Sequence, residues 1–174
     1  MSPRAKLGLV AAVCAAPFVL GTAAYLFGWA PGTPGNYGQL IAPRTLSGAP
    51  LDSLRGKWVL VSFDAAACDA YCERKLYFMR QVRTAQHKDA TRVERLWILT
   101  DGGRPRAEVL GAIEGTHVVP IKDAPALQGL AADAVDHIYV VDPLGNLMMQ
   151  FPRDPDPSKM LKDLQRLLRL SQIG

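Results

Sequence analysis

Residues 58–72 (Trp-Val-Leu-Val-Ser-Phe-Asp-Ala-Ala-Ala-Cys-Asp-Ala-Tyr-Cys) determine how the rest of the chain is organised. The run from Val59 to Phe63 is β-branched and aromatic, which is typical of a central strand covered on both faces. From Glu73 onwards the pattern becomes helical, because apolar residues recur at every third position: Leu76, Met79, Val82 and Ala85. The stretch therefore predicts a buried strand that leads directly into a helix, with Cys68 and Cys72 at the junction.

The two cysteines are expected to be chemically reactive. If the helix begins near Cys68, the side chains of Cys68 and Cys72 lie one turn apart on one face. A rise of about 1.5 Å per residue then places their α-carbons roughly 6 Å apart, which a disulfide can span. The amides at a helix N-terminus favour a thiolate at Cys68. A bridge that closes so short a loop stabilises little, so we expect a redox-active or metal-binding pair, open to solvent, rather than a structural staple.

Residues 1–30 are predicted to form a membrane anchor. The run from Leu7 to Ala30 carries no charge, and as a helix it is long enough to cross a hydrocarbon core of about 30 Å. A cleavable signal peptide is the alternative, because residues 21–24 offer small side chains to a peptidase. The apolar run continues through Tyr25, Leu26, Phe27 and Trp29, which favours a retained anchor with an aromatic end at the membrane interface.

The distribution of charge predicts the orientation of this anchor. Arg4 and Lys6 precede the apolar run, and no further charged residue occurs before Arg44. The positive-inside rule therefore predicts an inner (cytoplasmic) membrane protein with its N-terminus in the cytoplasm and its C-terminal domain in the periplasm. Cys14 lies within the apolar run and is interpreted as a plain apolar membrane residue. The other two cysteines lie in a compartment where disulfides persist.

The remaining chain is long enough for one domain with one core. Residues 31–53 are interpreted as a tether and an edge segment. The part from 31 to 43 is uncharged and rich in proline and glycine, and leucines that follow it are expected to pack on the domain: Leu46, Leu51 and Leu54. The domain itself is predicted to span residues 54–174. The formal net charge is only +4 and no basic block is present, so a nucleic-acid partner is not expected.

Further elements follow the cysteine helix in a regular order. The sequence predicts a strand at 93–100, a helix from Pro105, a short strand at 116–120, a helical turn at 126–132, a hairpin of strands at 137–142 and 146–151, and a final helix capped by Asp156. A strand–helix–strand unit followed by a hairpin and a terminal helix predicts an α/β fold, with a central sheet flanked by helices.

The region from about Leu54 to Leu170 resembles a thioredoxin fold, and within it most closely the membrane-anchored Sco/SenC family. Four features carry the resemblance: the strand 56–63 before the cysteines, the three residues between the cysteines, the segment 100–105, and the hairpin segment 138–145. The resemblance implies copper binding through Cys68, Cys72 and one histidine. It also implies service to the dinuclear copper centre of cytochrome c oxidase, with the copper-bearing subunit as partner.

The donor chemistry agrees with this expectation, because thiolates are soft ligands that suit Cu(I). Two thiolates and one imidazole would complete a trigonal site. His137, at the start of the hairpin, is the first candidate for the third ligand, and His117 and His87 follow. Ala134 occupies the position at which the family usually has its histidine.

Three functions remain open at this point. The domain could carry Cu(I) to an oxidase subunit. It could instead be a thiol–disulfide oxidoreductase for that subunit or for periplasmic thiol proteins in general, with Cys68 as the attacking thiolate and Cys72 as the resolving thiol. It could also be a non-redox scaffold of an assembly complex. Asp136 stands before His137, where thioredoxins usually have a cis-proline, which weakens a generic oxidoreductase activity.

Overall fold

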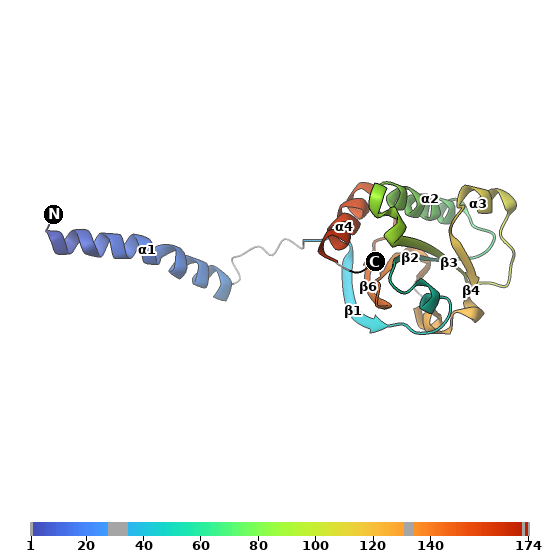
Figure 1. Ribbon diagram of the computed structural model, residues 1–174, viewed down its shortest axis with the longest axis horizontal. Coiled ribbons are helices and arrows are strands. Elements are labelled where there is room, and N and C mark those ends of the chain that lie inside the picture. Colours follow the sequence, from blue (N-terminus) through green and yellow to red (C-terminus); the bar gives the residue numbers. More distant parts are fainter. Residues whose placement is uncertain (1, 28–34, 131–133, 172, 174) are drawn as a thin grey trace. The chain divides into compact units, whose positions relative to one another are not determined.

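The computed structural model describes residues 2–27, 35–130, 134–171 and 173 (Figure 1). The chain forms two compact units that meet in sequence between Gly35 and Asn36, and each is described by itself.

The N-terminal unit contains one long helix, α1 (Pro3–Leu26). The Ser2 side chain caps it by accepting a hydrogen bond from the Ala5 amide. None of its residues is buried. By length and composition α1 is able to cross a membrane, as the sequence predicted.

The second unit is built on one six-stranded sheet in the order β1-β6-β5-β2-β3-β4. Its strands are β1 (Gln39–Thr45), β2 (Trp58–Asp64), β3 (Val93–Leu99), β4 (His117–Pro120), β5 (Ile138–Val141) and β6 (Asn146–Phe151). β2, β3 and β4 run parallel, whereas β5, β6 and β1 are added by antiparallel pairing. Every residue of β2 is buried, which is the environment that its β-branched and aromatic composition predicted.

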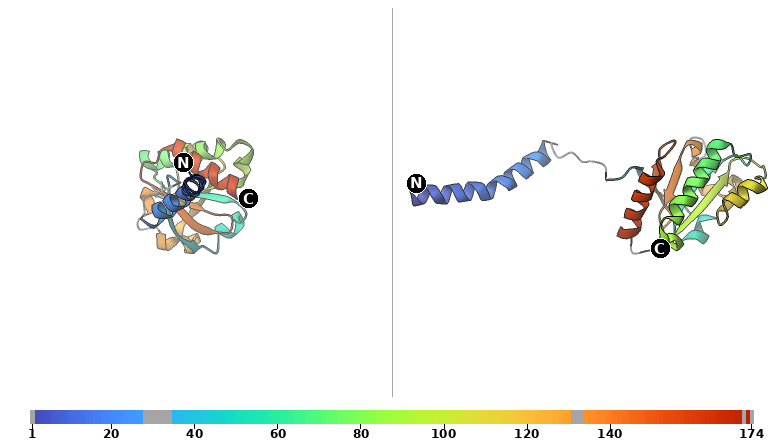
Figure 2. Two further views of the ribbon diagram at one scale, coloured as in Figure 1. Left: turned by 90° about the vertical axis from the view of Figure 1, so that its left-hand side faces the viewer. Right: turned by 90° about the horizontal axis from the view of Figure 1, so that it is seen from above.

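Three helices cover one face of this sheet: α2 (Ala70–Thr84), α3 (Ala107–Ala112) and α4 (Pro157–Leu170). They lie across the strands in the right-hand view of Figure 2. Their buried side chains form one core with alternate residues of the strands. The opposite face is covered by 3₁₀ turns, which include Leu51–Leu54, Pro125–Leu130 and Ala134–Asp136. The predicted sheet flanked by helices is therefore confirmed.

The predicted C-terminal helix is also confirmed. The Asp156 carboxylate accepts hydrogen bonds from the amides of Ser158 and Lys159 at 2.8 and 3.2 Å, so it caps α4. The buried apolar residues of α4 are Met160, Leu164 and Leu168. The hairpin and the strand at 117–120 are present as well. A helical turn is found at Pro125–Leu130, whereas residues 131–132 of the predicted turn lie outside the described residues.

β1 differs from the sequence prediction, because it begins within the stretch interpreted as a tether. The strand pairs with β6, and its register shifts between Leu40 and Arg44. None of its side chains is fully buried. Its sequence therefore lacks the alternation of apolar and polar residues by which a half-buried strand is recognised. Pro43 lies inside this shift, in agreement with the confinement of proline to edge strands and irregular positions.

The beginning of the compact unit is attached to α4 through a buried carboxylate. Asp163 on α4 is 5% exposed. Its Oδ2 accepts hydrogen bonds from the amides of Tyr37 and Gly38 at 2.8 and 2.7 Å. The chain that leads into β1 is thereby held against the helix layer.

Candidate functional site

Cys68 and Cys72 are joined by a disulfide, and their α-carbons lie 5.1 Å apart. The bridge lies where the loop after β2 meets the first turn of α2. The predicted proximity of the two thiols is therefore confirmed.

The helix begins near Cys68, as expected, but Cys68 itself lies outside it. α2 begins at Ala70, and Asp69 is its N-cap, with Oδ1 accepting a hydrogen bond from the Cys72 amide at 2.9 Å. Cys68 precedes the cap and has a φ of +43°. Aspartate is among the preferred N-cap residues, so the cap forms at Asp69. One amide that could have stabilised a Cys68 thiolate is thus occupied by a carboxylate.

The expectation that the cysteine pair is open to solvent is wrong, because each cysteine is only 2% exposed in this oxidised form. Arg106, just before α3, is bonded to the loop that carries the bridge: its Nη2 donates to the Cys68 carbonyl at 3.0 Å and pairs with the Glu73 carboxylate at 2.5 Å. The Arg106 and Glu73 side chains are themselves about half exposed. Because the two cysteines are buried, a partner reaches sulfur only after the chain around the bridge has moved.

A buried ion pair flanks the disulfide in sequence. Lys75 Nζ lies 2.9 Å from Asp64 Oδ1, and both side chains are almost completely buried. Ser62 Oγ donates to Asp64 Oδ2 at 2.6 Å, and Lys75 also donates to the Val135 carbonyl. Burial raises the pKa of the Asp64 carboxyl, and the Lys75 ammonium opposes this increase. Burial likewise lowers the pKa of Lys75, against the attraction of Asp64.

The sequence did not single out this pair. Lys75 occurs among several basic residues of a helix, where a charged side chain is normally solvated. The signal that could have distinguished it from Arg74 is its spacing: Lys75 lies three residues after Cys72, on the buried face of the helix.

Tyr71, between the two cysteines, connects α2 to the loop before β5. Its hydroxyl donates to the Asp136 carbonyl at 2.9 Å, and burial is the main cause of a raised pKa for this phenol. Cations surround its ring at 5.0 to 5.6 Å from the centroid: Arg74, Lys75 and Arg153. The segment that carries the disulfide is thereby linked to the backbone next to His137.

The three candidate histidines lie at different places. His137 Nδ1 lies 2.8 Å from the Phe151 carbonyl. Since a carbonyl only accepts, Nδ1 carries the proton and Nε2 retains its lone pair in the neutral ring. His117 Nε2 is 3.4 Å from the Glu94 carboxylate on the neighbouring strand. His87 is exposed at the start of the turn His87–Arg92.

No group of three or more His, Cys, Asp or Glu side chains in the described part of the chain is arranged to hold a metal ion. In this oxidised form the cysteines are thus brought together without a third ligand. Once reduced, the two thiolates would by themselves supply a soft donor pair that suits Cu(I).

A disulfide between the first core strand and the following helix, in a mixed sheet flanked by helices, defines a thioredoxin-like domain. Comparison with known families specifies this class further. The chain belongs to the family described as "Transmembrane-like, thioredoxin-like, C-terminal domain", which matches residues 58–171. A search of the curated proteins found no match.

Solved structures agree with the fold. Yeast Sco1 with copper bound is 15% identical, with a TM-score of 0.56 over 80% of this chain and 96% of that chain. BsSco, a member of the Sco family of cytochrome c oxidase assembly proteins in which a disulfide switch was identified, is 14% identical, with a TM-score of 0.51 over 79% and 97%. A provisionally assigned protein disulfide isomerase from Bacteroides thetaiotaomicron is 18% identical, with a TM-score of 0.52 over 78% and 89%. At these identities the similarity is one of fold.

Proposed function

We propose that this chain is a membrane-anchored thiol–disulfide exchange protein that acts on a cysteine pair of a partner outside the cytoplasm. The observation that carries this proposal is the Cys68–Cys72 bridge at the start of α2. A disulfide that closes a five-residue loop contributes little to stability, so the bridge can be broken and re-formed while the domain stays folded. The resemblance to Sco proteins favours the copper-ligand cysteines of an oxidase subunit as the partner pair.

The exchange conserves atoms and electrons without a further cofactor. The Cys68 thiolate of the reduced domain attacks one sulfur of the partner's disulfide, and the other partner sulfur leaves as a thiolate. The Cys72 thiolate then attacks Cys68 in the mixed disulfide and releases the second partner sulfur. The partner gains two electrons, and the domain returns to the bridged form.

The test is equilibration of the full chain, in neutral detergent, with glutathione of graded redox state, because a monothiol cannot resolve its own mixed disulfide. We expect the Cys68–Cys72 pair to open and close reversibly, and the Cys72→Ser variant to accumulate a mixed disulfide through Cys68. A bridge that stays closed up to the unfolding of the domain would overturn the proposal. A Cys68→Ser, Cys72→Ser double variant that still supports oxidase assembly in cells would instead indicate a scaffold.

A Cu(I) carrier is the second candidate, favoured by the lone pair that remains on His137 Nε2. The reduced chain should compete with a Cu(I) chelator, and it should lose this ability in the Cys68→Ser, Cys72→Ser variant. His137→Ala should weaken the binding if this imidazole completes the site. Binding that is equal in the double-cysteine variant would exclude copper carriage by these thiols.

The location also belongs to this proposal. Arg4 and Lys6 at the N-terminal end of α1 favour an inner-membrane protein with a cytoplasmic N-terminus and a periplasmic domain. Alkaline phosphatase, which is active only outside the cytoplasm, should be active when fused after Gly174. An inactive fusion would reverse the orientation.

A further inference from the structure

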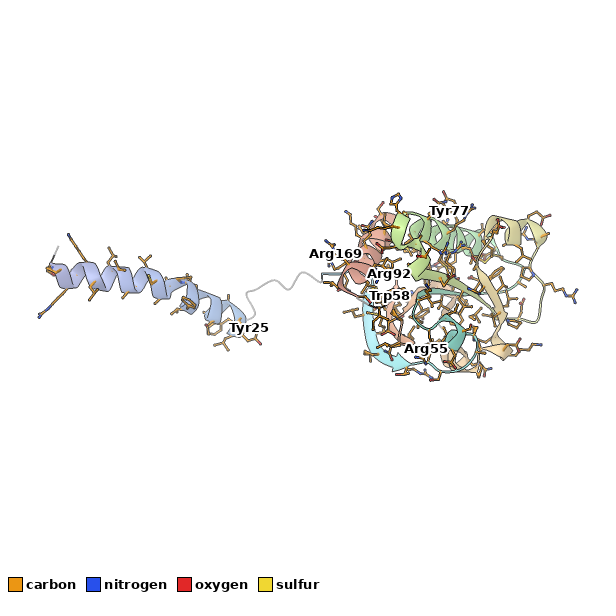
Figure 3. All side chains as sticks on the ribbon, viewed as in Figure 1. Tyr25, Arg55, Trp58, Tyr77, Arg92 and Arg169 are labelled. Atoms are coloured by element: carbon orange, nitrogen blue, oxygen red, sulfur yellow. A yellow bond between two sulfur atoms is a disulfide. The ribbon has the colours of Figure 1, made fainter. Side chains whose placement is uncertain are left out.

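A groove of about 500 Å³ lies between α2 and α3. Apolar side chains form much of its wall: Leu76, Tyr77, Val109, Ala112 and Ile113. Tyr77 is 55% exposed and lies on the outer side of the helix layer in Figure 3. A half-exposed tyrosine beside such a groove is typical of a surface that binds another protein.

One end of this α2–α3 groove lies at the first turn of α2, the turn that contains Cys72. Ala70 and Glu73, from this turn, line it together with Arg106. Arg106 also donates to the Cys68 carbonyl. An occupant of the groove would therefore touch a residue that is bonded to the loop of the disulfide.

The other end of the groove is positively charged. Arg80 lines it and donates to the Ala112 carbonyl at 2.9 Å. Near this end lies Arg95, which is 3% exposed and donates to the Glu114 carbonyl, while its Nε and Nη1 have no hydrogen-bond partner among the described residues. Burial is the main cause of a lowered pKa for Arg95, and the positive charges of Arg83 and Arg80 lower this pKa further.

Carboxylates also lie near these guanidinium groups. Glu94 favours the charged form of Arg95, and it is shared with Arg83 at 3.9 Å and His117 at 3.4 Å. Within the groove, Arg106 pairs with Glu73 and Arg74 pairs with Asp154, and Glu108 is a further lining carboxylate. Among the described residues, Arg80 is thus the lining guanidinium group without a carboxylate partner.

We propose that the α2–α3 groove docks an apolar segment of the thiol partner, and that a carboxylate in this segment binds at Arg80. The proposal rests on the proposed exchange function, because it places the partner's cysteine at Cys68. Arg80 lies eight residues after Cys72 on α2, which corresponds to about 12 Å along the helix. An extended segment covers this distance in about four residues. The partner's acidic residue is therefore expected about four positions from its reactive cysteine.

The test uses the full chain in neutral detergent with Cys14→Ala and Cys72→Ser, so that Cys68 is the reacting thiol. Short cysteine peptides are activated as disulfides with thionitrobenzoate. The Cys68 thiolate attacks the peptide sulfur, and thionitrobenzoate leaves with the electron pair and is measured by absorbance. One peptide carries glutamate four positions from cysteine with apolar residues between. A second carries lysine at that place, and a third carries the glutamate directly beside the cysteine.

We expect the first peptide to react about fivefold faster than the second, with a smaller difference at high salt. Arg80→Glu should abolish or reverse this preference, whereas Arg166→Glu, the same charge change on the exposed face of α4, should preserve it. Arg80→Gln, which keeps a hydrogen-bond donor towards Ala112, should abolish the preference without reversing it.

The outcomes separate docking from exchange. Equal rates for all three peptides, or a preference that Arg80→Glu leaves intact, would overturn the docking site while the exchange function stands. A Cys68 that reacts neither with the peptides nor with the small reagent dithiobis(nitrobenzoate) would overturn the proposed function itself.

Discussion

The carboxylate of Asp69 lies between Cys68 and the helix whose N-terminus would favour a thiolate. It accepts the Cys72 amide at 2.9 Å as the N-cap of α2. Its negative charge opposes a second negative charge at the adjacent cysteine. The reactivity of Cys68 therefore depends on this single side chain as well as on the helix.

Asp69→Asn tests this interaction, because asparagine preserves the cap and removes the charge. We expect reduced Cys68 to react with iodoacetamide roughly two- to fivefold faster at neutral pH, since a favourable helix-end charge contributes about 0.3–1 kcal/mol. Asp89→Asn, in the turn after α2, is the matched control. A rate that is unchanged or lower in Asp69→Asn would show that the cap carboxylate does not restrain the thiolate.

The Asp64–Lys75 pair gives a prediction about stability and pH. Lys75→Met leaves the buried Asp64 carboxylate without its cation, which should lower the free energy of unfolding by about 3–5 kcal/mol. Burial raises the pKa of Asp64 above its ordinary 3.8, so the folded variant keeps a proton that the unfolded chain has already lost. Its stability should therefore decrease as the pH rises from about 4 towards neutrality.

Urea denaturation across this pH range measures the effect. The Asp64→Asn, Lys75→Met double variant should lose most of the pH dependence, because it lacks the Asp64 carboxyl group. A single variant whose stability increases with pH would contradict the raised pKa.

At the scale of elements, the segment before α3 is joined to the start of α2. Arg106 makes this connection through the Cys68 carbonyl and Glu73. The contact is half exposed, and such ion pairs contribute only about 0–1 kcal/mol. We expect it to open at modest cost and thereby to loosen the loop that carries Cys68.

Arg106→Ala should therefore increase the rate of bridge reduction by dithiothreitol, by up to about fivefold. Arg166→Ala on α4 removes the same charge at a distance and should leave the rate unchanged. An unchanged rate in Arg106→Ala would mean that other side chains restrict access to sulfur.

The contact between α4 and the chain before β1 carries a second prediction at this scale. Asp163→Ala leaves the amides of Tyr37 and Gly38 without their acceptor. The loss should lower the free energy of unfolding by about 1–3 kcal/mol and allow faster proteolysis ahead of β1. Asp163→Asn, which retains one acceptor oxygen, should lose less. Equal stability in all three proteins would mean that water replaces the carboxylate.

At the scale of the whole molecule, the proposed exchange function requires the domain to remain folded with the bridge closed and with the bridge open. The Cys68–Cys72 bridge spans a sequence separation of 4, for which loop entropy predicts a stabilisation of only about 2 kcal/mol. The core on each face of the sheet is formed mainly by other residues, including Trp97, Phe63 and Phe151. Reduction should therefore lower the melting temperature by only a few degrees and leave circular dichroism near native. A reduced chain that unfolds at room temperature would identify the bridge as structural.

The sequence by itself determined the features that depend on local pattern. The buried strand 58–64, the cysteine helix, the hairpin and the Asp156-capped helix follow from side-chain periodicity and capping chemistry. The apolar N-terminal helix follows from length and composition, and the proximity of Cys68 and Cys72 follows from their spacing.

Only the tertiary structure decided what depends on residues far apart in sequence. β1 has exposed side chains and is a strand because β6 lies beside it. Lys75 can be buried because its ammonium group pairs with the Asp64 carboxylate and donates a hydrogen bond to the Val135 carbonyl. The disulfide is buried because both cysteines pack in the core formed by the helices and the strands, and Arg106, 38 residues after Cys68, donates to the Cys68 carbonyl. The burial and pairing of residues far apart in sequence depend on how the elements pack together. The periodicity of side chains within one helix or strand carries no information about that packing.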